Sequence, residues 1–244
     1  MPDVSKLWRP AEVADRYRSL LMSVGSVVDD LADVTLTSHW PLVGTAPGRV
    51  LVIGQAVFGW IPSWHASRLS TPAGVDEILA ETQLACYERQ DPMDWIVENR
   101  ARASPFWRTV RLTMEGLHPD STLPWFSHVA WANLYPVARN DIKGNPDGTL
   151  RDVQTRPAAE LVDAIARALD PDLTLVLAGT FWWPFTERLA LTDSLVAERP
   201  LLCLGRRHGQ PWIIGMHPGG AQRRGWGARA YADHIVAAVE RLNS

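Results

Sequence analysis

The chain has few of the residues that several common kinds of site require. Its 244 residues include only two cysteines, Cys86 and Cys203. Two cysteines are too few for a zinc site built from cysteines alone or for an iron–sulfur cluster. A disulfide is not expected in a cytoplasmic protein. We therefore expect no metal and no other cofactor.

Long hydrophobic runs are also missing. No apolar run approaches the roughly 20 residues that a membrane-spanning helix needs. The first residues, MPDVSKLWRPAEVADRYR, are too polar for a signal peptide. Because 46% of the residues are hydrophobic and 21% are charged, a disordered chain is excluded. The sequence thus predicts a soluble, cytoplasmic protein with no membrane partner.

Several catalytic signatures are absent. The chain contains no G-x-S-x-G, no G-x-x-x-x-G-K-[ST] and no H-E-x-x-H, and no G-x-G-x-x-G follows its first apolar strand. These absences argue against a serine hydrolase elbow, a phosphate-binding P-loop, a zinc protease and a dinucleotide-binding site.

The net charge of −3 argues against a strongly basic nucleic-acid-binding protein. The charge is unevenly distributed, however, because residues 199–241 contain seven arginines against Asp233 and Glu240, a net +5. Since basic residues here are almost all arginine, chance clustering is an alternative reading. The basic C-terminal part is a candidate contact for an anion.

Apolar and amphipathic segments alternate along the chain. Buried strands are expected at residues 49–55, 128–137 and 173–179, and the segments 200–205 and 210–218 flank a turn around Gly209. Helices are expected at residues 1–33, 75–89, 104–117, 158–169, 181–191 and 228–242. This alternation predicts an α/β fold with a mainly parallel sheet covered on both faces. We expect one domain over residues 1–244, with residues 1–45 as a helical extension packed on it.

Ligands of parallel sheets bind where the strands end. The predicted strands end at Gln55, Asn133, Gly179 and His217. We therefore expect these four strand ends to converge on one crevice.

The segment after the last of these strands has several features of an anion site. His217 can donate a hydrogen bond to an oxygen in the crevice, although a histidine that merely caps a loop is the alternative. Gly219 and Gly220 allow close backbone approach, and Arg223 and Arg224 add positive charge. A phosphate or a DNA backbone would fit this arrangement.

The other strand ends carry amide and aromatic side chains. Asn133 can read the edge of a nucleobase or, equally well, cap a turn. Gln55 can hold a water molecule or a carbonyl group, but it cannot act as a general base. Phe58 and Trp60 in the first loop can stack on a planar ligand. Adjacent tryptophans at 182 and 183 are expected to serve packing.

The order of these motifs resembles the uracil-DNA glycosylase superfamily. VLVIGQAVFGW is similar to the strand that ends in the catalytic loop of the family, and VAWANLYPV to the strand that ends in Asn. LTLVLAGTFWW is similar to the next buried strand, and WIIGMHPGGAQRRG to the strand that ends in His-Pro-Ser. The similarity spans residues 49–242, and the His-Pro segment is its most specific part.

The resemblance implies a three-layer α/β/α sandwich with a short, four-stranded parallel central sheet. It implies that the protein hydrolyses the N-glycosidic bond of uracil or another deaminated base in DNA. Asn133 would then read the base, Phe58 would stack on it, and His217 would stabilise its developing anion. The His-Pro loop with Gly219 and Gly220, followed by Arg223 and Arg224, would bind DNA.

The sequence departs from the family pattern at two places. Gln55, Ala56 and Val57 stand where active members carry Asp, Asn or Glu, and Gly219 replaces the serine of His-Pro-Ser. If the chain is an enzyme, Gln55 would position the water. Two alternatives follow: a nucleobase- or nucleic-acid-binding protein without hydrolytic activity, and a hydrolase of a small nucleoside-like metabolite.

Overall fold

The computed structural model describes residues 8–31, 34–47, 49–56, 62–85, 93, 103–140 and 148–243. Contacts between residues divide the chain into two compact units, each assembled from three stretches of sequence. Unit 1 consists of Met1–Pro41, Gln55–Arg89 and Ala132–Leu169, and unit 2 of Leu42–Gly54, Gln90–Trp131 and Asp170–Ser244.

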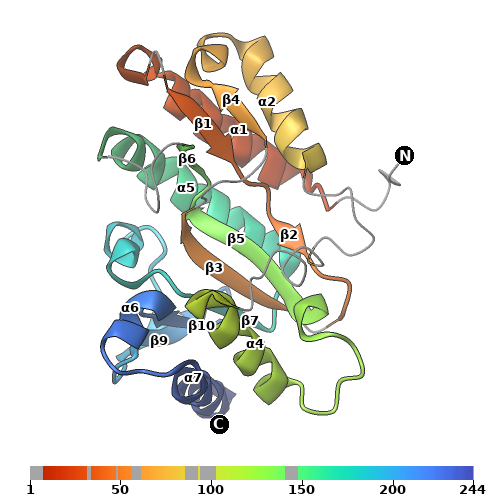
Figure 1. The fold of residues 1–244 in the computed structure, drawn as a ribbon, viewed down its shortest axis with the longest axis vertical. Coiled ribbons are helices and arrows are strands. Elements are labelled where there is room, and N and C mark those ends of the chain that lie inside the picture. The colour runs from red at the N-terminus through yellow and green to blue at the C-terminus, as the bar shows by residue number, and fades with distance from the viewer. Residues whose placement is uncertain are drawn as a thin grey trace. The chain divides into compact units, whose positions relative to one another are not determined.

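Unit 1 contains helices and a small antiparallel sheet. Its helices are α1 (Ala11–Gly25), η2 (Val28–Leu31), η3 (Ala66–Ser70), α2 (Pro72–Ala85) and α5 (Gly148–Leu169). The strands β1 (Thr35–Ser38), β4 (Ser63–His65) and β6 (Val137–Arg139) form a sheet in the order β4-β1-β6, with both neighbours antiparallel to β1 (Figure 1). Among its described residues, the helical extension expected over residues 1–45 therefore also contains two strands, β1 and β2 (Leu42–Val43), which are too short to give a clear apolar pattern.

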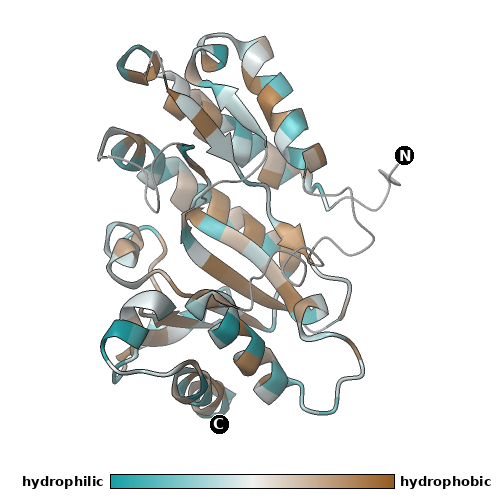
Figure 2. Cartoon of the chain, viewed as in Figure 1, coloured by the Kyte–Doolittle hydropathy of each residue, from teal (hydrophilic) through white to brown (hydrophobic). Residues whose placement is uncertain are grey.

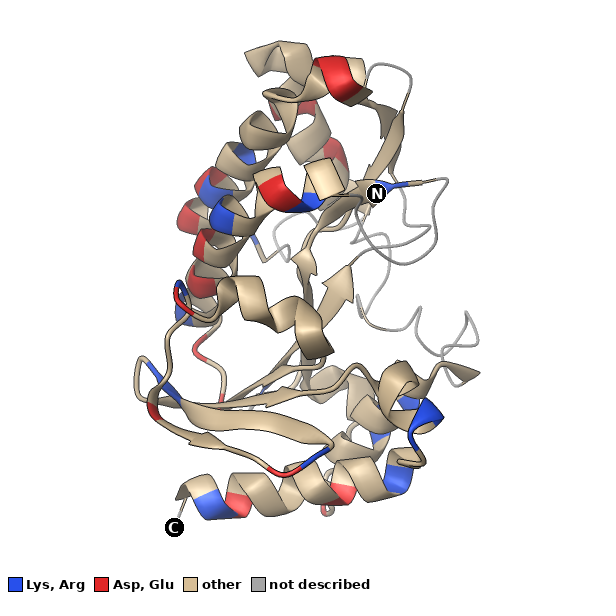
Figure 3. Cartoon of the chain, turned by 90° about the vertical axis from the view of Figure 1, so that its left-hand side faces the viewer, with Lys and Arg blue, Asp and Glu red and all other residues tan. Residues whose placement is uncertain are grey.

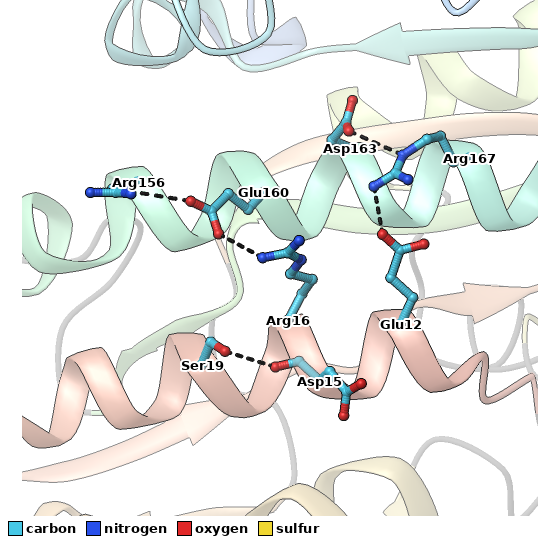
Figure 4. Close-up of polar contacts among 8 residues, drawn as sticks. All are labelled: Glu12, Asp15, Arg16, Ser19, Arg156, Glu160, Asp163 and Arg167. Carbon is cyan, nitrogen blue, oxygen red and sulfur yellow. Dashed lines mark hydrogen bonds and ion pairs between the residues drawn. The ribbon is translucent and has the colours of Figure 1, made fainter.

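Helix α1 packs along α5 through an apolar stripe. The spacing that predicted α1 is the spacing of its buried residues, which are Val13, Tyr17, Leu20, Leu21 and Val24. Ion pairs flank the stripe: Arg16 lies 3.0 Å from Glu160, and Arg167 lies 2.6 Å from Glu12 (Figure 4). Because these charged side chains are at least 40% exposed, the apolar stripe contributes most of the stability.

The larger sheet has seven strands in the order β2-β5-β3-β7-β10-β9-β8. The bounds of these strands are β2 (Leu42–Val43), β3 (Val50–Ala56), β5 (Val129–Tyr135), β7 (Leu173–Val176), β8 (Thr192–Val196), β9 (Leu201–Arg207) and β10 (Gln210–Gly215). β7 pairs in parallel with both β3 and β10, whereas β9 and β8 continue the sheet antiparallel and β2 is antiparallel to β5. The α/β class with a mostly parallel centre is confirmed, but the sheet is mixed and larger than the four-stranded parallel sheet that the resemblance implied.

The turn expected around Gly209 is confirmed. His208 and Gly209 join β9 to β10 with φ angles of 52° and 80°. Two consecutive positive φ angles give the turn twist that matches two antiparallel strands, and glycine adopts such an angle without strain.

The helices of unit 2 include two that the sequence predicted closely. The described helices of unit 2 are α4 (Pro105–Leu117), η5 (Trp125–His128), η6 (Gly179–Phe185), α6 (Pro218–Arg223) and α7 (Ala228–Asn243), and the two predicted closely are α4 and α7. α4 follows Ser104 with Pro105 in its first turn, as expected, and it packs on α7. In Figure 2, β3 is mainly brown, whereas α4 alternates between brown and teal. A continuous apolar run is typical of a strand that is buried on both faces, as β3 is, and alternation is typical of a helix that is buried on one face, as α4 is.

Two elements differ from the prediction. α5 begins at Gly148 rather than at residue 158, and Pro157 lies inside it. Contacts of its first turns with β6 outweigh the cost of the proline. The helix expected at residues 181–191 is only the short η6, and the strand β8 follows it. β8 escaped prediction because all five of its residues are exposed and it has no apolar face.

Within the described residues, no helix combines the length and the hydrophobicity needed to cross a membrane.

Candidate functional site

Three strands, β3, β7 and β10, are in parallel register near their carboxyl ends. Ile53 of β3 and Ile214 of β10 are both register partners of Val176 in β7. Because the three strands are parallel, their exits lie at the same edge of the sheet. A Cβ atom added to Gly179, just beyond β7, would lie 3.2 Å from the backbone nitrogen of His217, just beyond β10. Gly179 and His217, which follow β7 and β10, therefore lie against each other, and β3 runs beside β7. This is part of the convergence of four strand ends that the sequence predicted.

His217 is the N-cap of the six-residue helix α6, and its imidazole has a defined tautomer. The backbone N–H of Gly219 donates a hydrogen bond to its Nδ1 atom at 3.2 Å. A neutral imidazole that accepts at Nδ1 carries its proton on Nε2. No residue in the described part of the chain forms a hydrogen bond with Nε2. His217 therefore offers one N–H donor to a ligand.

The electrostatic surroundings keep this imidazole neutral. Burial lowers the pKa of His217, and the positive charge of Arg223 lowers it further. An ordinary histidine has a pKa of about 6.5, so His217 is uncharged at pH 7. A neutral donor can polarise a carbonyl oxygen and stabilise negative charge as that charge develops.

The backbone before His217 is held by a buried tyrosine. The hydroxyl of Tyr231, on α7, donates a hydrogen bond to the carbonyl of Met216 at 2.6 Å. A side chain at Gly215 would collide with this hydroxyl, so the glycine is required for the contact. Burial raises the pKa of Tyr231, which keeps the hydroxyl protonated as a donor.

A series of aromatic ring contacts begins at His217. Phe106 of α4 stacks on the imidazole with 6.1 Å between ring centroids and 25° between ring planes. Phe106 contacts Trp107 edge-on at 4.9 Å, and Trp107 contacts Trp131 of β5 edge-on at 5.0 Å. Sequence reasoning missed Phe106 and Tyr231, because nothing in a single sequence indicates which helix residues reach a distant strand end.

The four residues predicted to bind DNA have the exposure that such contacts need. Gly219 and Gly220 are half-buried, and Arg223 and Arg224 are exposed. Neither arginine makes an ion pair within the described residues. Figure 3 shows blue segments on α6 and at the start of α7, where Arg229 is also exposed. These charges are free to bind an anion.

Asn133 and Gln55 belong to unit 1. Asn133 lies inside β5, which continues to Tyr135, so the prediction that the strand ends at Asn133 is wrong. Only 4% of its surface is exposed, and its Nδ2 atom has no hydrogen-bond partner in the described part of the chain. Buried amides normally have partners, so this group is a candidate for contact with a ligand. Gln55 is half-buried near the end of β3. That these two side chains share a crevice with His217 stays a prediction, and Phe58 lies outside the described residues.

The two adjacent tryptophans differ, and the expectation that both serve packing is wrong for one of them. Trp182 is buried and contacts Phe185 and Trp212, with ring centroids 6.4 Å and 6.2 Å away. Trp183 is 55% exposed.

Cys203 is a free, half-buried cysteine whose pKa is raised by burial. A search of the described residues found no cluster of three or more His, Cys, Asp or Glu side chains that could hold a metal ion.

A comparison of the sequence with models of known protein families found no match, and neither did a comparison with curated proteins.

Proposed function

We propose that the protein is a DNA base glycosylase that hydrolyses the N-glycosidic bond of uracil or another deaminated base. The observation that carries the proposal is the state of His217, a neutral imidazole whose Nε2–H lacks a partner among the described residues. It stands at the exit of a parallel strand, where α/β proteins bind their ligands.

Hydrolysis of this bond needs little chemistry from the protein. The bond between C1′ of the sugar and the base nitrogen breaks, and its electron pair leaves with the base. A donor at a carbonyl oxygen of the base stabilises the anion that forms. Water then adds to C1′, and its proton passes to the departed base or to solvent. The Nε2–H group of His217 would supply the donor.

The remaining predicted residues take supporting roles in the proposal. Asn133 would read the edge of the extruded base with its Nδ2 group, which lacks a partner among the described residues, and Phe58 would stack on the base. Gln55 would hold the attacking water without accepting its proton. The proposal also includes the three-layer α/β/α arrangement of a single domain that the resemblance implied.

DNA would be bound beside His217. Arg223 and Arg224 would contact phosphates, and the backbone at Gly219 and Gly220 would approach the strand closely. The space near Gly220 supports this role, because a Cβ atom added there would have no neighbour within 4 Å.

An excision assay tests the proposal. Purified protein is incubated with oligonucleotides that contain uracil, hypoxanthine or xanthine, and alkali then cleaves each strand at abasic sites. We expect cleavage on at least one substrate and about a 10²- to 10³-fold slower rate for His217→Ala. The exposed His65 serves as a matched control, so His65→Ala keeps the rate. Absence of cleavage on all three substrates at high protein concentration contradicts the proposal.

The second candidate is a binding protein that recognises a base or a nucleic-acid end without hydrolysing it. It is favoured by Gln55 and Ala56, which provide no carboxylate at the end of β3. Affinity for DNA that falls steeply with added salt, without cleavage, identifies this function. Activity on free nucleosides but not on oligonucleotides would instead indicate a hydrolase of a small metabolite, which the net charge of −3 suits.

A further inference from the structure

Trp183 is a large aromatic side chain that packing does not explain. Its neighbours in η6, Trp182 and Phe185, are 2% and 0% exposed, whereas Trp183 is 55% exposed. Within the described part of the chain, its indole makes no ring contact and no hydrogen bond. Most of one of the largest apolar side chains is therefore available to a partner.

Trp183 lies in the helix that begins beside His217. η6 begins at Gly179, whose backbone lies against the backbone of His217. A 3-10 helix rises about 2.0 Å per residue, so Trp183 lies about 8 Å along the helix from Gly179. One strand of duplex DNA rises about 3.4 Å per nucleotide. Trp183 is therefore two or three nucleotide steps from the strand exit that Gly179 and His217 share.

The charge of this region suits a nucleic acid strand. Arg223, Arg224 and Arg229 are exposed and make no ion pairs among the described residues. Near Trp183, the negative charge of Glu187 is balanced by the positive charge of its neighbour Arg188. The helix α6, which carries Arg223, begins after His217, and η6 begins at Gly179, which lies against His217, so both helices start at the same strand exit.

We propose that Trp183 is a stacking platform for a base of single-stranded nucleic acid, two or three nucleotides away from the one held at His217. This inference rests on the proposed function for the nucleotide at His217. Base–aromatic stacking accepts any base, so the platform would hold the strand without reading its sequence. A single strand is required because a paired base does not present its face.

Two oligonucleotides separate stacking from phosphate contacts. One is a fluorescent decamer of thymidylate, and the other is a decamer of the same charge made of abasic sugar phosphates. Stacking is worth about 5- to 150-fold in affinity per base, so Trp183→Ala should weaken binding of the thymidylate decamer by that factor. Its affinity for the abasic decamer should not change.

Two further variants serve as controls. Trp183→Phe keeps an aromatic face and should recover most of the affinity for the thymidylate decamer. Leu195→Ala removes a side chain that is 63% exposed on β8 and should leave both affinities unchanged. Thermal melts of each variant check that the fold is retained.

The outcomes distinguish this inference from the proposed function. If Trp183→Ala binds the thymidylate decamer as the wild type does, the proposal that Trp183 stacks on a base is wrong. Base release in the excision assay would still support the glycosylase. An equal loss on both decamers also overturns the platform, because it shows a structural role. If the wild type binds neither decamer, and Trp183→Ala abolishes a self-association seen by sedimentation, Trp183 belongs to a protein interface.

Discussion

At the residue scale, three contacts with the backbone position His217. Gly219 fixes its tautomer, Gly179 packs against its nitrogen, and Tyr231 holds the carbonyl that precedes it. Gly179 has a φ angle of +61°, so another residue there would be strained as well as crowded against His217. The imidazole is thus positioned before any ligand arrives.

A gain of activity at residue 55 would reveal the role of the missing acid. Gln55→Glu adds a carboxylate that can accept a proton from water, which the amide cannot do. We expect base release from uracil-containing DNA to rise about 10²-fold or more, within the usual contribution of a general base. The excision assay measures this change. Ala56→Asp is a second variant for the same test, and unchanged or slower release in both variants would show that no water is held there.

At the scale of elements, α5 shows how tertiary contacts override a local signal. Gln154 is fully buried, and its side-chain amide pairs with the backbone of β6. The backbone N–H of Val137 donates to its Oε1 at 3.1 Å, and its Nε2 donates to the carbonyl of Val137 at 2.9 Å. These bonds stabilise the turns of α5 that precede Pro157.

Removing this side chain should be costly. Gln154→Ala leaves both backbone groups of Val137 buried without partners, so we expect a loss of about 2–4 kcal/mol in the free energy of unfolding. Urea denaturation measures the loss. Gln222 on α6 is exposed, and Gln222→Ala should change the free energy by less than about 0.5 kcal/mol. Equal effects of the two substitutions would refute the role of Gln154.

At the scale of the whole molecule, histidines with lowered pKa values, His39 and His118 as well as His217, make stability depend on pH. Burial lowers the pKa of His39 to about 3. The pKa of His118 is also lowered, by burial and by His128, whose ring stacks on it with 4.1 Å between centroids. These side chains are held neutral in the folded protein and take up protons more readily when it unfolds.

The protein should therefore lose stability as the pH falls below about 6.5, the pKa of histidine in an unfolded chain. Because the folded pKa of His39 is near 3, the loss from this residue is about 1.4 kcal/mol per pH unit down to that value. Urea denaturation at pH 7.5 and 5.5 measures the change. His39→Gln should flatten the dependence, and His118→Gln is a second variant if the first does not fold. Equal stability of the wild type at the two pH values would contradict this prediction.

Much of the fold could be predicted because its signals are local. An apolar run predicted β3, Ser104-Pro105 predicted the start of α4, and Gly209 predicted the hairpin. β8 could not be predicted because none of its residues is buried. At the site, the strand ends predicted His217, whereas Phe106 depends on how α4 packs, which no sequence pattern encodes.

The side chain of His217 provides the most direct test of the central claim, that it offers a neutral N–H donor to a nucleobase. Nitrogen-15 NMR can follow its two ring nitrogens, assigned by comparison with His217→Gln, at pH 7. The ligand is a DNA decamer with one 2′-fluoro-deoxyuridine, whose fluorine opposes positive charge at C1′ and slows cleavage. We predict a proton on Nε2 in the free protein and a shift of the Nε2 signal when the decamer binds. A proton on Nδ1, or an Nε2 signal unchanged at saturating decamer, would contradict the claim.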